Sequence, residues 1–208
     1  MLTALLTFTP AAALIVLLPG PDTLVVLRNL LRYGRRRATL TVLGVLTGLT
    51  VWVSAAAFGL SAVLRASHEA YTVLRIVGAI YLLWLGVNSL RSRLATIPNP
   101  RDEVAVSARR GLLGSGFAAG LATDLLNPKV GVFFVTFLPG FIPTGQSVGL
   151  TSLLLGAIFI VETALYFAIV LALAGRVTGW MEDARIRRRL DRATGFVLIG
   201  FGIRLAVE

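Results

Sequence analysis

The chain is divided into apolar runs about as long as a bilayer is thick, and short arginine-rich segments separate them. A transmembrane helix needs about 20 predominantly apolar residues. Hydrophobic residues make up 56% of the chain, above the roughly 45–50% of soluble domains, and mean hydropathy is +0.84. Backbone polar groups in lipid must be paired within their own segment, which helices achieve. The sequence therefore predicts an all-α membrane protein in a lipid bilayer.

Six apolar runs are interpreted as transmembrane helices. The first includes the N-terminus, which we expect to be a retained helix rather than a signal peptide. It lacks a basic start, and no cleavage site of small residues precedes Pro19. The predicted spans are roughly Leu2–Leu31, Leu40–Leu64, Tyr71–Leu90, Gly111–Leu138, Val148–Ala174 and Ala193–Val207.

Arginines are distributed unevenly between the loops. Sixteen lie in or beside the first, third and fifth loops and three on the other side, while the fourth loop (139–147) carries no charge. The positive-inside rule therefore predicts cytoplasmic loops one, three and five, with both termini periplasmic. The same rule accounts for the net charge of +10, so nucleic-acid binding is not expected. Cysteine is absent and His68 is the only histidine, so no metal or other cofactor is predicted.

The third loop is the longest and divides the chain into two halves of three spans. Repeat one covers about 1–95, the cytoplasmic linker about 96–110 and repeat two about 111–208. The third spans of the halves begin alike, with Arg75-Ile-Val-Gly78 and Arg192-Ala-Thr-Gly195. An odd number of spans per half turns the second half upside down, as in the inverted repeats of many secondary transporters. We therefore expect a single six-helix transporter domain made of two inverted three-helix repeats.

The first helix of each half is interrupted. The interruptions are Pro19-Gly20-Pro21 and Asn127-Pro128-Lys129, the first about 17 residues, or about 25 Å of helix, into its span. Proline removes a backbone donor and clashes with the carbonyl four residues earlier. In lipid such a break is tolerated where the backbone is buried in protein or lines a watery cavity, and the half-helix ends attract ions. Two corresponding breaks indicate a substrate site, and a proline kink without a ligand is the alternative.

Four ionisable residues are predicted within the spans, where each is a functional candidate by default. Lys129 is the only lysine, and its compact ammonium suits a carboxylate; a structural ion pair with Asp22 or Asp124 is the alternative. Helix capping is the alternative for Asp22. Asp22, Asp124 and Glu162 are the candidates for holding a substrate ammonium or carrying a coupling proton. The predicted substrate-binding residues are Pro19, Gly20, Pro21, Asp22, Asp124, Asn127, Pro128 and Lys129.

Small residues recur at helical spacing in three places. The glycines are Gly44 with Gly48, Gly116 with Gly120, and Gly78 with Gly86. Glycine allows two helices to approach closely. We therefore predict helix contacts at these positions rather than ligand binding.

A set of motifs is spread in order along nearly the whole chain: Pro19-Gly20-Pro21-Asp22, Arg32-Tyr33-Gly34-Arg35-Arg36, Gly44 with Gly48, Gly78 to Gly86, Leu126-Asn127-Pro128-Lys129 and Phe137-Leu138-Pro139. This set resembles the LysE/RhtB amino-acid exporters. The resemblance implies a six-span bacterial inner-membrane protein that exports amino acids or derivatives, such as lysine, threonine, homoserine or homoserine lactone, by ion-coupled transport. It also implies that the two interruptions are the family's broken-helix motifs. Many members carry an acidic residue where this chain has Leu49, which argues against a cationic substrate.

These features together predict a secondary transporter, not an enzyme, that exports a small neutral amino acid or derivative in exchange for protons. A zwitterion needs one cationic and one anionic contact, and the two breaks with their charges offer both. The sequence is also compatible with a homo-oligomer. One alternative is an exporter of metal or other cations, which cadmium sensitivity of a deletion strain would reveal. The other is a membrane-embedded enzyme, although no Ser/His or paired-His arrangement is found.

Overall fold

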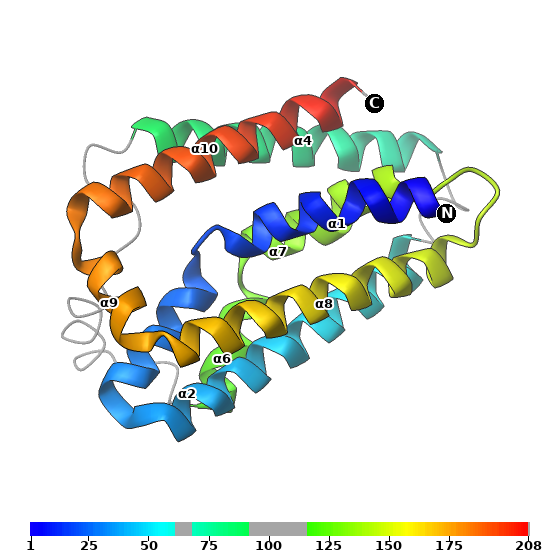
Figure 1. Cartoon of the computed structure of the whole chain (residues 1–208). Helices are drawn as coiled ribbons and strands as arrows, with labels where there is room; N and C mark the ends of the chain where they lie inside the picture. Colours follow the sequence, from blue (N-terminus) through cyan, green and yellow to red (C-terminus); the bar gives the residue numbers. More distant parts are fainter. Residues whose placement is uncertain (61–67, 92–115, 208) are drawn as a thin grey trace.

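The computed structural model describes residues 1–60, 68–91 and 116–207, and these ranges are helical without strands (Figure 1). This confirms the predicted all-α class. The predicted linker at 96–110, the end of the second span at Leu64 and the start of the fourth at Gly111 lie outside the described residues. The elements are α1 (Leu2–Leu17), α2 (Pro21–Ala55), η1 (Ala56–Leu60), α4 (His68–Arg91), α6 (Phe117–Leu125), α7 (Pro128–Val132), η2 (Phe133–Phe137), η3 (Leu138–Phe141), α8 (Val148–Ala172), α9 (Ala174–Glu182) and α10 (Ala184–Val207).

The first predicted interruption is present between α1 and α2. α1 ends at Leu17, and Leu18 is extended, with φ −74° and ψ 111°. α2 begins at Pro21, where the fixed φ and the missing N–H of proline suit the first helical position. Gly20 is the N-cap of α2 and has an extended backbone. The prediction that the first span is broken at Pro19-Gly20-Pro21 is therefore confirmed.

The first predicted loop is a single-residue turn. α2 comprises two helices joined at Gly34, whose φ of 79° lies in the left-handed region. Glycine adopts that region without a steric penalty. The arginines on both sides of Gly34 are helical because arginine is a good helix former. In Figure 1 the chain reverses direction here.

The second predicted interruption is also present. α6 ends at Leu125, α7 begins at Pro128, and the two segments are bent by 51°. Asn127 caps α7, because its side chain accepts a hydrogen bond from the backbone N–H of Lys129 at 3.1 Å. Beyond α7 the chain continues through η2 and η3, which carry most of the phenylalanines of the core.

Several described helices have the length and composition of membrane spans. By length and composition two stretches suffice to cross a membrane: Pro21–Gly59, which includes the turn at Gly34, and Val148–Ala172. The bent pair Phe117–Leu125 with Pro128–Phe141 makes a third if it is one span, and Leu2–Leu17 is a shorter apolar helix. These helices are compatible with the predicted membrane protein. The arrangement of six spans as two inverted repeats remains a prediction.

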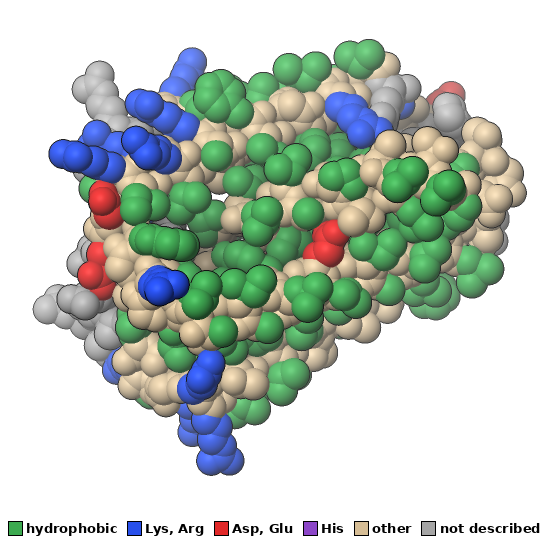
Figure 2. Space-filling view, in the orientation of Figure 1, with side chains coloured by type: hydrophobic (Ala, Val, Ile, Leu, Met, Phe, Trp, Pro, Cys, Tyr) green, Lys and Arg blue, Asp and Glu red, His purple; other side chains and the backbone are tan. Residues whose placement is uncertain are grey.

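The last helix is longer than the predicted sixth span, Ala193–Val207, and corrects the loop predicted before it. α10 begins at Ala184 rather than Ala193, so the arginine-rich segment predicted as part of a loop is helical. Hydropathy excludes this segment from a span, but arginine favours helix and its long side chain carries the charge away from apolar surroundings. Most basic side chains gather at the left-hand end of the molecule, whereas both termini lie at the right-hand end (Figures 1 and 2).

Two helix pairs, α2 with α6 and α4 with α10, make extensive contacts through glycines. A Cβ atom on Gly44 would collide with the Phe117 carbonyl, and one on Gly120 with the Thr41 carbonyl. Where α4 and α10 cross, a Cβ atom on Gly86 would lie 2.8 Å from the Gly195 carbonyl oxygen. The prediction that these glycines serve helix contact is therefore confirmed for Gly44, Gly86 and Gly120.

Gly120→Ala should lower the stability of the protein. The added methyl group would meet the backbone carbonyl of Thr41, which cannot move without shifting α2. Overpacking of this kind costs about 1–3 kcal/mol, which should appear as a lower unfolding temperature in detergent. Gly200→Ala on α10 is the matched control, because its Cβ atom would meet nothing within 4 Å. Equal unfolding temperatures for the two variants would contradict the close contact.

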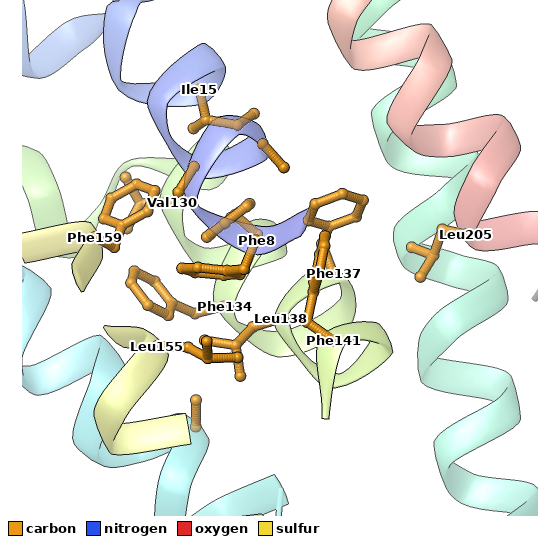
Figure 3. Packing of buried hydrophobic residues seen from close by; sticks show 14 of the residues in the cluster. Phe8, Ile15, Val130, Phe134, Phe137, Leu138, Phe141, Leu155, Phe159 and Leu205 are labelled. Carbon is orange, nitrogen blue, oxygen red and sulfur yellow. The ribbon is translucent and has the colours of Figure 1, made fainter. Parts of the chain in front are cut away.

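The main core is rich in aromatic residues, which come from α1, η2, η3 and α8 (Figure 3). Phe8 of α1 lies amid phenylalanines from η2, η3 and α8, with ring centroids 5.9 Å from Phe133 and 5.3 Å from Phe141. The Arg204 guanidinium lies over the Phe141 ring, 4.6 Å from its centroid. Aromatic side chains therefore hold α1 against η2, η3 and α8.

Candidate functional site

The two breaks are in direct contact. The Asn127 side-chain amide donates a hydrogen bond to Asp22 Oδ2 at 2.6 Å. Lys129 Nζ donates to the backbone carbonyls of Ile15 at 3.2 Å and Leu18 at 2.9 Å. These carbonyls belong to the last turn of α1 and its C-cap, where a helix leaves acceptors without intrahelical donors. The second break thus supplies the partners that the first break needs.

Opposite charges occupy corresponding positions after the two breaks. Asp22 is the second residue of α2 and follows Pro21, and Lys129 is the second residue of α7 and follows Pro128. Gly20, rather than Asp22, is the N-cap of α2. The carboxylate of Asp22 is hydrogen-bonded to Asn127, and its position in the first turn suits the helix dipole. The capping alternative for Asp22 is therefore not supported.

Asp124 contributes a second carboxylate beside Lys129. It is fully buried, and a Cβ atom on Gly48 would collide with its carboxylate. Neither of its carboxylate oxygens has a hydrogen-bond partner within the described part of the chain. The charge of Lys129 acts on both Asp22 and Asp124. Since the ammonium donates its hydrogen bonds to carbonyls, the three charges form an electrostatic group rather than one direct ion pair.

Two cavities meet at the contact between the breaks. The smaller has a volume of about 30 Å³, enough for a water molecule, which needs about 10–15 Å³; Asp22 and Asp124 both line it. The larger has a volume of about 520 Å³. Gly20 and Lys129 line both cavities, and a Cβ atom on Gly20 would lie 3.3 Å from Lys129 Nζ. The larger cavity is lined by all six residues of the breaks: Pro19, Gly20, Pro21, Asn127, Pro128 and Lys129.

Glu162 lies apart from these two cavities. It lines a third cavity of about 460 Å³, together with Thr23 and Tyr166. The hydroxyl groups of Thr23 and Tyr166 are 3.2 Å apart and join α2 to α8, and both residues also line the small cavity. The sequence analysis assigned neither Thr23 nor Tyr166 to the site. These two residues are 143 positions apart, so no local sequence pattern predicts the contact between their hydroxyl groups.

Trp52 is another residue that the sequence did not associate with the breaks. Its indole Nε1 donates a hydrogen bond to the backbone carbonyl of Asp124 at 3.3 Å, at the end of α6. A Cβ atom on Gly131 would lie 2.9 Å from its ring. Trp52 therefore ties α2 to both sides of the second break.

Comparison with known proteins gives a consistent picture. A family described as LysE type translocator matches residues 13–208. The chain is 31% identical to the threonine efflux protein of Escherichia coli (strain K12), over 100% of both chains. It is 30% identical to the leucine efflux protein of Klebsiella pneumoniae, over 97% of this chain and 93% of that protein. The uncharacterized membrane protein YrhP of Bacillus subtilis is 32% identical over 99% of both chains. No solved structure matches the chain.

Proposed function

This chain belongs to the LysE type translocator family, and on that premise we propose that it exports a small, neutral amino acid or derivative from the bacterial cytoplasm in exchange for protons. A member of a translocator family is a multi-pass membrane transporter rather than an enzyme. Two relatives that cover nearly the whole chain are named for the efflux of threonine and leucine, both of which are neutral amino acids. We assign the same class of cargo to this protein.

The observation that carries the proposal is the meeting of the two breaks at Asp22, Asn127 and Lys129. A zwitterionic amino acid presents one carboxylate and one ammonium. The compact ammonium of Lys129 suits the carboxylate, and Asp22 or Asp124 can accept from the substrate ammonium. Because a zwitterion adds no net charge, its binding between these groups leaves the charge of the buried site unchanged.

Counterflow in proteoliposomes tests the proposal. Purified protein is reconstituted into vesicles loaded with one unlabelled amino acid, and uptake of the labelled form is measured for alanine, threonine, leucine and lysine. We expect exchange of the neutral amino acids and little exchange of lysine. Exchange of lysine alone would contradict the neutral class of substrate, and exchange of none would contradict the proposed function.

We also propose that the protein lies in the bacterial inner membrane with both termini periplasmic. Two exposed positions can carry a single introduced cysteine: Gln146, in the turn before α8, and Arg36, beside the turn at Gly34. The chain has no native cysteine. An impermeant maleimide added to intact cells should label Gln146→Cys and not Arg36→Cys. Arg36→Cys should become reactive once the membrane is permeabilised. The opposite pattern in intact cells would reverse the proposed orientation.

A further inference from the structure

The cavity of about 520 Å³ extends from the breaks to Arg28 on α2 and Asp191 on α10. Its size falls within the roughly 300–1,000 Å³ of small-molecule sites. Besides the breaks, its walls are formed by one side each of α2, α4 and α10, on which most lining residues recur at helical spacing, and by Thr123 of α6. The wall has an apolar part, Leu24, Leu85 and Leu198, and a polar part, Arg28, Asn88 and Asp191.

We propose that this cavity, called here the chamber, is the compartment that binds the substrate, and that its leucines select an aliphatic side chain. The inference rests on the proposed function and deepens it. Lys129 lines the chamber and the cavity of about 30 Å³, whereas cavities of about 510 and 460 Å³ border other break residues but are not lined by Lys129. An amino acid whose carboxylate is held by Lys129 is therefore expected to direct its side chain into one of the first two. The smaller cavity has room for water and not for a side chain. The apolar wall contributed by α4 and α10 therefore faces the part of the substrate that differs between amino acids.

Leu85 is the residue best suited to test this selection. It lies on α4, is partly buried and packs against the core from the chamber side. Ile80, five residues earlier on α4, serves as the control position. It is 60% exposed on the surface of the helix bundle and does not line the chamber. Leu85→Ala widens the chamber and Leu85→Phe narrows it, whereas the same changes at Ile80 alter only the outer surface.

Counterflow with alanine, valine, leucine and phenylalanine gives the readout as a ratio of rates within each variant. Leu85→Ala should raise phenylalanine exchange relative to alanine exchange by roughly tenfold, the scale by which apolar pockets discriminate size. Leu85→Phe should lower leucine exchange relative to alanine exchange by a similar factor. The Ile80 variants should keep the wild-type ratios. Ratios that are unchanged in both Leu85 variants would overturn the chamber assignment while leaving the proposed function intact, whereas a wild type that exchanges no amino acid would overturn both.

A second measurement does not depend on replacing a packed leucine. Asn88 is exposed, lines the chamber and lies one helical turn from Leu85. A cysteine at Asn88, the only thiol in the variant, should react with a maleimide in detergent, and saturating leucine should slow that reaction severalfold. A cysteine at Tyr33, which is 45% exposed and does not line the chamber, serves as the control. Equal protection of the two thiols, or protection of neither by any amino acid that the protein exchanges, would overturn the assignment.

Discussion

Lys129→Ala should abolish export, lowering the rate of amino-acid counterflow about 100-fold, because truncating one partner of a buried, hydrogen-bonded charge pair costs about 2–5 kcal/mol of binding. The variant loses the contact proposed for the substrate carboxylate and leaves Asp22 and Asp124 without their nearby cation. It also removes two hydrogen bonds to the end of α1. Counterflow must therefore be compared with the unfolding temperature in detergent, so that a transport defect is separated from a folding defect.

Lys129→Gln and Lys129→Arg separate the two roles of the side chain. Glutamine can still donate hydrogen bonds to the carbonyls of Ile15 and Leu18 but carries no charge, so the variant should fold and fail to transport. Arginine keeps the charge, but Gly20 packs against the ammonium and leaves little room for a planar guanidinium, so recovery should be small. Wild-type counterflow in Lys129→Gln would show that Lys129 caps α1 and does not contact the substrate.

Asp22→Asn should preserve exchange of substrate while abolishing uptake driven by a pH gradient. Asparagine keeps the size of aspartate and retains an oxygen that can accept the hydrogen bond from Asn127, but it cannot release a proton. One oxygen of Asp22, Oδ1, is buried without a partner in the described residues, and the residue lines the small cavity beside Lys129. The measurement compares counterflow with pH-driven accumulation in the same vesicles.

Asp124→Asn and Glu162→Gln are the comparison variants. Asp124 lines the same small cavity as Asp22, whereas Glu162 lies outside it, so we expect Glu162→Gln to keep most pH-driven uptake. If Asp22→Asn accumulates substrate normally, the coupling proton belongs to one of the other two carboxylates. If all three variants do so and a voltage or sodium gradient drives uptake instead, the proton-exchange mechanism is wrong.

The sequence predicted those parts of the fold that proline and apolar length determine. The breaks at Pro21 and Pro128 follow from the missing N–H of proline, and α8 follows from an uninterrupted apolar run. Charged segments were predicted less well. The residues around Gly34 and those before Ala193 were expected to be loops, because hydropathy registers arginine as polar and ignores its helix propensity.

The contacts within the candidate site could not be predicted from local pattern. Lys129 is bonded to carbonyls 111 and 114 residues away, and a backbone carbonyl carries no side-chain signature. Gly20 was expected simply as part of the break, but its backbone is extended rather than left-handed, and the space beside it is taken by the ammonium of Lys129. The need for a residue without a side chain at position 20 therefore comes from Lys129, which is distant in sequence, and only the three-dimensional structure reveals it.

The positions of Asp22 and Lys129, each directly after the proline that opens a half-helix, bear on how a protein with two similar halves can have arisen. Under the proposed inverted repeat, a symmetric dimer of two first halves would bring two carboxylates together, and a dimer of two second halves would bring two ammonium groups together. Like charges facing each other cost several kcal/mol. A pairing of unlike halves instead brings the carboxylate of Asp22 and the ammonium of Lys129 to the contact between the breaks. Once this pair was in place, neither half could be duplicated or replaced by a copy of the other, and fusion in one gene guarantees that they are made in equal number.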